Sequence, residues 1–110
     1  MIKALFFDID GTLVSFRTHS VPKPTVEALA EARRRGVRIF ISTGRPKPLI
    51  NNLDPIESLI DGYITVNGAI CTVGSETVSR NPIDPKDVEV ILHAADRMDV
   101  PSLIVGEDRA

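Results

Sequence analysis

Apolar and polar positions fall into blocks that predict a strand, a helix and a second strand in turn. Residues 4–7 form a short apolar run that stops at Asp8, which is typical of a parallel strand covered on both faces. Residues 25–35 carry apolar side chains at helical spacing, and Gly36 follows them as a helix stop. Residues 37–41 are again apolar enough for a strand. This order predicts a βαβ unit in a parallel sheet.

The middle of the chain continues this alternation. Residues 47–60 predict one or two short helical pieces broken at Pro55. Residues 63–66 predict a third short strand, which ends at Asn67. Residues 1–67 are therefore predicted to form a parallel α/β sheet with its connecting helices.

A different pattern begins at residue 68. Residues 69–79 predict a β-hairpin that turns at Gly74, and residues 102–105 predict a last strand. Between them, Asp84 is a natural N-cap for a helix whose apolar positions recur every three or four residues. We expect residues 68–110 to form a separate unit of α+β character.

Composition narrows the class of protein. The chain has 110 residues, 43% of them hydrophobic and 25% charged, with a net charge of −2, which excludes a disordered chain and a strongly basic nucleic-acid binder. No apolar stretch approaches the ~18 residues that a membrane helix needs. The single cysteine, Cys71, excludes a disulfide framework and fits a reducing compartment. We therefore expect a cytoplasmic protein that contacts neither nucleic acid nor membrane.

Two carboxylates stand close together at the end of the first predicted strand. Asp8 and Asp10 are followed by Gly11, which permits a turn that a Cβ would obstruct. In open α/β sheets, ligands bind beyond the carboxyl ends of the strands. Close carboxylates repel one another unless a cation intervenes, and Mg²⁺ suits such oxygen-rich sites. One Asp here can attack phosphorus as a nucleophile, while the other donates and accepts a proton.

A second polar segment follows the second strand, at the same end of the predicted sheet. Thr43 and Gly44 offer a hydroxyl and close-approaching backbone N–H groups, which suit an anion. Arg45 or Lys47 adds positive charge. Acidic turns and capping hydroxyls are also common as purely structural features after strands. The spacing of one βαβ unit between the two segments favours a shared site.

Four other residues are weaker candidates. His19 is expected to be a solvated loop residue, while His93 and Cys71 are expected to be structural. Asn67 leaves two alternatives open: it forms a turn with the glycine that follows it, or it faces the site from the end of the third strand.

Three segments resemble motifs of one enzyme family. Residues 8–13 (DIDGTL) resemble motif I of the haloacid dehalogenase (HAD) superfamily. Residues 41–46 (ISTGRP) resemble its motif II in the form used by Cof-type sugar phosphatases of subclass IIB. Residues 66–69 (VNGA) are similar to the Asn-Gly-Ala segment that these proteins carry before their cap domain. The resemblance extends over all 110 residues and is close to Bacteroides-type hexose-phosphate phosphatases.

The resemblance implies catalytic and metal-binding roles for both carboxylates. Asp8 becomes the nucleophile that forms an aspartyl phosphate, and it is also a Mg²⁺ ligand. Asp10 becomes the general acid/base, and its backbone carbonyl also binds Mg²⁺. The implied reaction is hydrolysis of small phosphorylated metabolites, sugar phosphates above all.

The resemblance also implies how the phosphate is held. The hydroxyl of Thr43 and the backbone N–H of Gly44 would bind the transferring phosphoryl group. The backbone of Gly11 and Thr12 would line the phosphate site. Arg45 would help to position the substrate or its phosphate.

The implied fold is a HAD-like Rossmannoid sheet of which only the beginning is present. Residues 1–67 would be the N-terminal part of the core with motifs I and II, and residues 68–110 would begin a type IIB cap. Family members are more than twice as long, and they carry a motif III lysine and a motif IV acidic cluster downstream. Neither has a counterpart here, because Lys86 lies in the predicted cap helix. Asp96 and Asp99 lie on that helix too, rather than after a glycine at a strand end. We expect this chain to be a fragment that binds Mg²⁺ weakly and hydrolyses phosphate esters poorly.

Two other functions are consistent with the sequence. The chain could be a non-catalytic remnant or interaction module that self-associates through uncovered sheet edges. It could also be a receiver-type phosphoacceptor domain, which uses clustered aspartates as well. The receiver alternative is disfavoured because the third predicted strand ends in Val66 and Asn67 rather than in an Asp.

Overall fold

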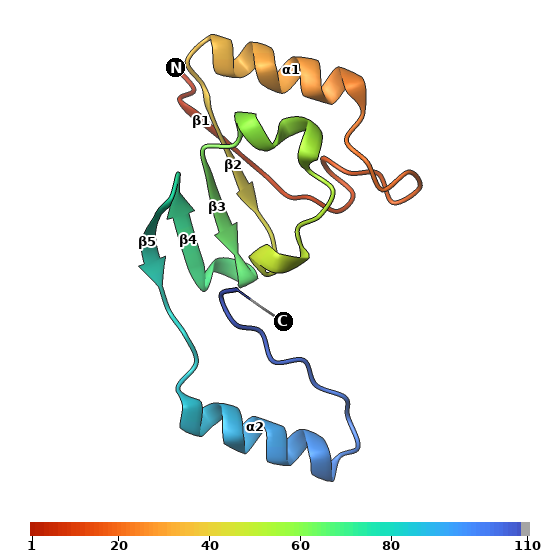
Figure 1. The fold of residues 1–110 in the computed structure, drawn as a ribbon, viewed down its shortest axis with the longest axis vertical. Coiled ribbons are helices and arrows are strands. Elements are labelled where there is room, and N and C mark those ends of the chain that lie inside the picture. Colours follow the sequence, from red (N-terminus) through yellow and green to blue (C-terminus); the bar gives the residue numbers. More distant parts are fainter. Residues whose placement is uncertain (109–110) are drawn as a thin grey trace.

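The computed structural model describes residues 1–108, and its central feature is one five-stranded mixed sheet in the order β1-β2-β3-β4-β5 (Figure 1). In chain order the elements are β1 (Ala4–Phe7), α1 (Lys23–Arg34), β2 (Arg38–Ser42), the 3₁₀ helices η1 (Lys47–Leu49) and η2 (Asp54–Leu59), β3 (Gly62–Thr65), the 3₁₀ turn η3 (Val66–Gly68), β4 (Ile70–Val73), β5 (Glu76–Arg80) and α2 (Pro85–Arg97). The predicted α/β class is confirmed.

The first three strands are parallel and end at the same edge of the sheet. Phe7 of β1 pairs with Ile41 of β2, and Ser42 of β2 pairs with Ile64 of β3. The residues that follow these strands, beginning with Asp8 and Thr43, therefore emerge side by side. This register puts both candidate segments at one edge, as parallel pairing requires.

The hairpin β4–β5 continues the same sheet. β4 pairs antiparallel with β3, with Gly62 opposite Val73. A Cβ at Gly62 would lie 2.3 Å from the backbone oxygen of Thr72 and 2.9 Å from the Phe40 ring. A glycine is therefore needed where the hairpin meets the parallel strands. The division of the chain at residues 67 and 68 remains a prediction.

The hydrophobic core lies on one face of the parallel strands. It consists of Ile9, Leu13, Val14, Val21, Leu29, Ile39, Ile41, Leu53 and Ile56. Helix α1 and η2 contact each other, and α1 packs on β2, so both cover this face. The other face is open, because Phe6 is 59% exposed although its ring stacks on Phe40 with 4.9 Å between centroids. The expectation that β1 is covered on both faces is wrong for residues 1–108.

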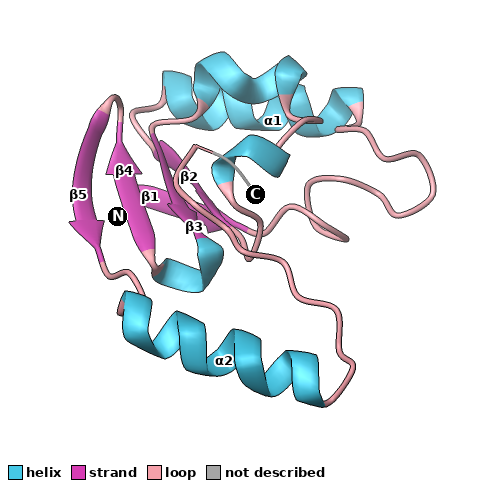
Figure 2. Cartoon of the chain, turned by 60° about the horizontal axis from the view of Figure 1, so that its bottom comes forward, coloured by secondary structure: helices cyan, strands magenta, loops and turns pink. Residues whose placement is uncertain are grey.

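Helix α2 stands apart from this core. Asp84 caps it by accepting a hydrogen bond from the Lys86 N–H at 2.9 Å, which confirms the predicted helix start. The molecule measures 52 × 33 × 22 Å with a radius of gyration of 16.5 Å, whereas a compact domain of this length is expected near ~13 Å. α1 and α2 lie at opposite ends of the molecule (Figures 1 and 2).

Two predictions about local structure are wrong. Residues 102–105 form no strand, because a strand needs a partner edge and the chain after α2 runs back without pairing with one. The helical pieces after β2 are separated by residues 50–53 rather than broken at Pro55, which lies in the first turn of η2. Proline is tolerated there because that N–H has no helical partner in any case.

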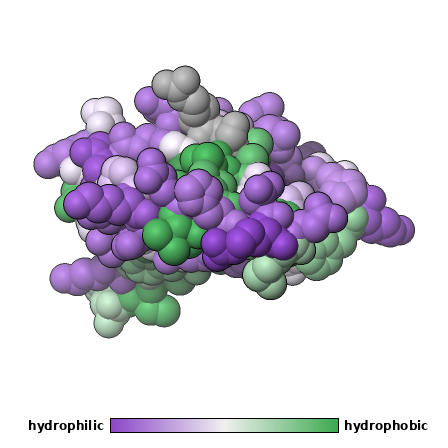
Figure 3. Space-filling model, turned by 90° about the horizontal axis from the view of Figure 1, so that it is seen from below, coloured by the Kyte–Doolittle hydropathy of each residue, from purple (hydrophilic) through white to green (hydrophobic). Residues whose placement is uncertain are grey.

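The end of the molecule that carries α2 exposes apolar side chains. Seen from this side, hydrophobic surface gathers among the polar residues (Figure 3). Large exposed apolar residues of this part include Val90, Met98, Leu103 and Ile104. Among residues 1–108, no helix has the length and apolarity that crossing a lipid bilayer requires.

Candidate active site

The loop after β1 carries two carboxylates, one on each side of the buried residue Ile9. Ile9 is completely buried, while Asp8 and Asp10 are exposed. The Ile9 carbonyl accepts hydrogen bonds from Leu13 at 3.1 Å and Val14 at 3.0 Å. These bonds close the chain into a tight loop, so both carboxylates stay at the edge of the sheet.

Gly11 makes this loop possible. Its φ is +82°, and a Cβ there would lie 2.6 Å from the ring of Phe16. Its N–H donates to the Val14 carbonyl at 2.8 Å, and the Thr12 N–H donates to Ile9 at 3.2 Å. Both amides predicted to line a phosphate site are therefore engaged within the loop, and a phosphate there would compete with these bonds.

The loop after β2 lies beside the first one and is fixed by β3. Thr43 is 6% exposed, its N–H donates to the Ile64 carbonyl at 2.9 Å, and its own carbonyl accepts from Asn67 at 3.2 Å. A Cβ at Gly44 would lie 3.0 Å from the Asn67 side-chain oxygen. Gly44 is exposed, and within residues 1–108 no backbone carbonyl is found to accept a hydrogen bond from its N–H.

Asn67 combines the two alternatives that the sequence leaves open. Its φ of +52° is the turn conformation that Asn tolerates better than most residues. Its amide also packs against Gly44, at the edge where the two loops meet. The sequence signal for this contact is the position of Asn67 just beyond the end of a parallel strand, with Val66 between them.

Arg45 joins the two loops directly. Its Nε donates to Asp10 Oδ2 at 2.9 Å, and a second guanidinium nitrogen donates to Asp10 Oδ1. The remaining terminal nitrogen donates to the Leu49 carbonyl at 3.0 Å. The Arg45 backbone N–H donates to Thr43 Oγ1 at 3.0 Å. Asp10 and Thr43, which lie 33 positions apart, are thereby brought into one hydrogen-bonded unit.

This ion pair changes the acidity of both partners. The hydrogen bonds from Arg45 hold the pKa of Asp10 below its usual value, although burial acts in the opposite direction. The pKa of Arg45 is raised by Asp10 in turn, and the negative charge of Asp8 adds to this effect. Asp10 is therefore mostly ionised at neutral pH in this arrangement.

The two carboxylates suit a magnesium ion with an incomplete protein shell. Within the described part of the chain, no cluster of three or more His, Cys, Asp or Glu could hold a metal. Mg²⁺ is commonly held by one or two carboxylates, with water and substrate phosphate completing its six positions. The Asp8 carboxylate is exposed at this edge, so the donor set fits Mg²⁺ on those terms.

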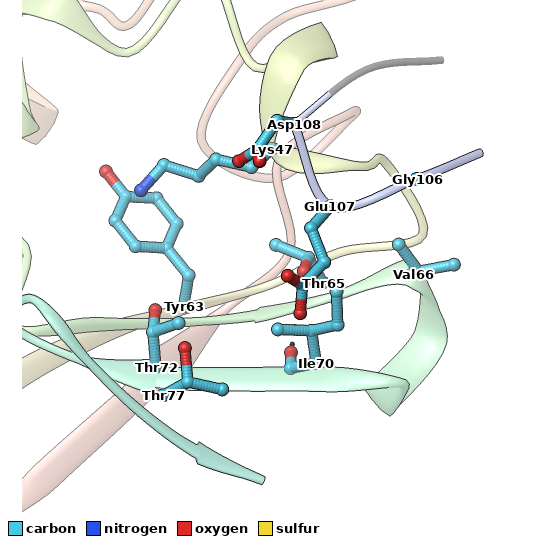
Figure 4. A pocket seen from close by; sticks show the side chains of 10 residues that line it. All are labelled: Lys47, Tyr63, Thr65, Val66, Ile70, Thr72, Thr77, Gly106, Glu107 and Asp108. Atoms are coloured by element: carbon cyan, nitrogen blue, oxygen red, sulfur yellow. Dashed lines mark hydrogen bonds between the residues drawn. The ribbon is translucent and has the colours of Figure 1, made fainter. Parts of the chain in front are cut away.

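A cavity of about 150 Å³ is lined by Lys47 of η1, by Tyr63 and Thr65 of β3 and by residues of the β4–β5 hairpin (Figure 4). Lys47 reaches over Tyr63, with its Nζ 3.7 Å from the ring centroid. Burial raises the pKa of the Tyr63 hydroxyl. Glu107 also lines this cavity and pairs with Arg80. Neither Asp8 nor Asp10 lines it, so it is separate from the carboxylate pair.

The weaker candidates lie outside the site or at its margin. His19 has a φ of +54°, and its carbonyl accepts a hydrogen bond from Asn52 at 3.5 Å. His93 is exposed on α2, far from both loops along the chain. Cys71 is half-buried in the hairpin strand β4.

Comparison with known proteins points to one family. The profile of haloacid dehalogenase-like hydrolases matches residues 5–110. YkrA of Bacillus subtilis (strain 168) is 30% identical over 96% of this chain, which covers 40% of YkrA. The phosphoglycolate phosphatase of Metallosphaera sedula (strain ATCC 51363 / DSM 5348 / JCM 9185 / NBRC 15509 / TH2) is 32% identical over 80% of this chain, which covers 40% of it.

Solved structures give the same result. The HAD subclass IIB sugar phosphatase BT4131 is 51% identical, with a TM-score of 0.90 over 96% of this chain and 41% of its own. The chain therefore spans about 40% of the length of the relatives that it matches.

Proposed function

Because this chain belongs to the haloacid dehalogenase-like hydrolase family, we propose that it carries the nucleophile and the phosphate-binding loop of a Mg²⁺-dependent phosphatase. The substrates are small phosphorylated metabolites, above all sugar phosphates, as the name of the relative BT4131 suggests. The observation that supports this most is the meeting of the Asp8–Asp10 loop with the Thr43 loop, joined by Arg45.

The reaction proceeds in two steps, each of which uses this chain's own residues. In the first, a carboxylate oxygen of Asp8 attacks phosphorus and the bond from phosphorus to the ester oxygen breaks. Asp10 in its protonated form, which is the minor form at neutral pH beside Arg45, gives its proton to the leaving oxygen. In the second, the ionised Asp10 takes a proton from water as its oxygen attacks phosphorus. The bond to Asp8 then breaks, which releases phosphate and restores the Asp8 carboxylate.

The loop after β2 holds the phosphoryl group. Thr43 Oγ1 already accepts a hydrogen bond from the Arg45 N–H, which leaves its own hydrogen free to point at a phosphate oxygen. The exposed Gly44 supplies a backbone N–H beside it. Such preorganised donors stabilise the charge on a transferring phosphoryl group.

Mg²⁺ would be held by the Asp8 carboxylate and the Asp10 backbone carbonyl, and when bound it would neutralise charge on the phosphate oxygens. The remaining donors would come from water and substrate. Residues 1–67 form the core part of this site, and residues 68–110 begin a cap. A cytoplasmic location is consistent with the single cysteine of the sequence, Cys71, and with metabolite substrates.

The test is phosphate release by the protein expressed from its complete reading frame. Hexose 6-phosphate and 4-nitrophenyl phosphate are supplied with Mg²⁺ and with EDTA. We expect Mg²⁺-dependent release, and a loss of at least ~10³-fold in Asp8→Asn because no covalent step remains. Asp96→Asn, an exposed carboxylate on α2, is the control and should retain full activity. A wild type inactive on every phosphate monoester tested, or an Asp8→Asn variant as active as wild type, would contradict the proposal.

Self-association is a second candidate function, favoured by the edge of the sheet. β1 pairs only with β2 among residues 1–108, and Phe6 beside this edge is 59% exposed. Open strand edges pair readily with other chains. Size-exclusion chromatography of residues 1–110 should then show a dimer that Phe6→Lys converts to a monomer, and a wild-type monomer would exclude it.

A further inference from the structure

We propose that Arg45 is a positioning residue, which fixes the ionised Asp10 carboxylate in the place where it takes a proton from water. This proposal rests on the proposed function, and it assigns Arg45 to the second chemical step rather than to substrate binding alone.

Arg45 is itself fixed at several points. Its guanidinium donates to the Leu49 carbonyl at 3.0 Å, and its backbone N–H donates to Thr43 Oγ1 at 3.0 Å. Its backbone carbonyl accepts from the Val66 N–H at 3.2 Å. The guanidinium is therefore tied to η1 through Leu49, and the backbone of residue 45 is tied to Thr43 and to the start of η3. A planar fork held in this way dictates where the carboxylate lies.

Asp10 depends on Arg45 for its orientation. Within residues 1–108, the only hydrogen bonds to the Asp10 carboxylate come from Arg45, and the Asp10 side chain is 43% exposed. Without the arginine, this carboxylate would be free to rotate in solvent. Both of its oxygens accept hydrogen bonds from the one guanidinium, so the plane of the carboxylate follows the plane of that group.

A second arginine–aspartate pair in the same molecule provides the contrast. Arg33 donates to Asp61 Oδ1 at 3.2 Å and to the Leu59 carbonyl at 3.2 Å. The other oxygen of Asp61 accepts from the Ile39 N–H at 2.9 Å. Asp61 is thus also held by the backbone of β2, and it lies away from both loops. Arg33→Lys is therefore a matched control for Arg45→Lys.

A lysine at position 45 keeps the positive charge of Arg45 but lacks the planar guanidinium with its several N–H donors. A single ammonium cannot hold both carboxylate oxygens in one plane and also reach the Leu49 carbonyl. The Thr43 and Val66 contacts use only the backbone of residue 45, so the loop itself should persist in Arg45→Lys. The variant therefore removes the orientation of Asp10 while leaving the phosphate-binding loop in place.

The experiment separates the two chemical steps with 4-nitrophenyl phosphate. Its leaving group needs no proton, so an initial burst of nitrophenolate reports attack by Asp8, and the later steady rate reports hydrolysis of the aspartyl phosphate. In Arg45→Lys of the full chain with Mg²⁺, we expect the burst rate to stay within about threefold and the steady rate to fall about 10²-fold, since small misplacements of a catalytic group cost that much. Mass spectrometry should show the phosphorylated chain accumulating.

The control and the contrary results distinguish a role of Arg45 in positioning Asp10 from a role in substrate binding or in the fold. Arg33→Lys should leave both phases unchanged. If both phases fall together in Arg45→Lys, the arginine acts on substrate binding or on the fold, and if neither falls it has no role; either result overturns the proposal. A wild type without turnover would refute the proposed function instead.

A second measurement needs no turnover and tests only whether Arg45 holds Asp10 through hydrogen bonds. The Arg45 Nε–H should give a slowly exchanging ¹⁵N resonance in the wild-type chain, and this protection should be lost in Asp10→Ala. The Arg33 resonance should stay unchanged in the same variant. An Arg45 resonance that is identical in both proteins would overturn the inferred clamp even if the enzyme is active.

Discussion

The two ends of the chain share one sheet but differ sharply in burial. Among residues 1–108, every buried residue lies between Ile9 and Thr65. All five positions of β5 are exposed, and α2 has no buried residue. The candidate active site lies at the edge of the buried part, where Thr43 and Ile9 anchor its two loops. Catalytic side chains need such a fixed base, since placement within a fraction of an ångström governs rate.

The contrast predicts unequal stability within one molecule. The C-terminal part contributes little core, and it is tied to the rest through the pairing of β4 with β3. Segments with few buried apolar contacts open at low free energy. The site loops should therefore remain ordered while α2 and the chain after it exchange more freely with open forms.

The largest expected effect comes from truncating a core side chain beneath the site. Ile41 is completely buried in β2, two residues before Thr43, whereas Ile91 on α2 is 54% exposed. Ile41→Ala should lower the free energy of unfolding by about 2–5 kcal/mol, through lost transfer energy and a cavity. Ile91→Ala should change it by less than about 0.5 kcal/mol. Urea unfolding followed by circular dichroism measures both, and equal losses would show that the two parts are equally well packed.

The junction of the two parts gives the next largest effect. At Gly62 an added Cβ would lie 2.3 Å from the Thr72 backbone oxygen. Gly62→Ala should therefore force β3 and β4 apart and destabilise the fold by about 1–3 kcal/mol. Gly74→Asn is the control, because the hairpin turn has open space and a φ of +59° that Asn accepts. Hydrogen exchange of β4 amides should rise in Gly62→Ala alone; unchanged exchange would mean that the junction adapts.

Most of the secondary structure, in both parts of the molecule, can be predicted from the sequence for a physical reason. Short apolar runs and the Asp84 cap are local signals, so β1, β2, β3, the hairpin and α2 are each found to within a few residues. The meeting of the carboxylate loop and the Thr43 loop follows from parallel pairing, and the bond between Asp10 and Arg45 confirms that they meet. The roles of the individual site residues remain predictions.

The features that the sequence does not predict depend on contacts between residues that lie far apart along the chain. The strand predicted at residues 102–105 has the right composition, but a strand also needs an edge to pair with, which no local pattern encodes. The exposure of Phe6 likewise depends on which face α1 and η2 cover. The clamp of Arg45 on Asp10 depends on side-chain reach across 35 positions, so the sequence indicates only an extra positive charge near the site.

A smaller effect on stability is expected in helix α2, which depends on a single hydrogen bond at its N-terminus. Asp84 caps α2 through the Lys86 N–H, and no buried face holds this helix in place. Asp84→Ala should reduce the stability of α2 by about 1 kcal/mol, while Asp84→Asn keeps the cap. We expect faster amide exchange within α2 but an unchanged urea midpoint for the core. A core midpoint that moves together with α2 would show that the two parts unfold as one unit.

The smallest effect concerns charges on the solvent side of α1, which test whether burial or surface pairing sets the stability of the N-terminal part. Hydrogen bonds from Arg34 and then Arg35 lower the pKa of Glu31 to about 2, from an ordinary value of 4.5. A carboxyl whose pKa is lower in the folded chain stabilises it above the unfolded value, so this contribution is complete above pH 4.5 and is lost as the pH falls toward 2. Arg34→Gln should raise the pKa of Glu31 in a ¹³C NMR titration, whereas Arg38→Gln, on β2, should leave it unchanged. Because the pair is exposed and screened by solvent, the unfolding midpoint at neutral pH should barely move. A large shift in that midpoint would mean that surface charge, and not the core beneath the site, sustains this half of the molecule.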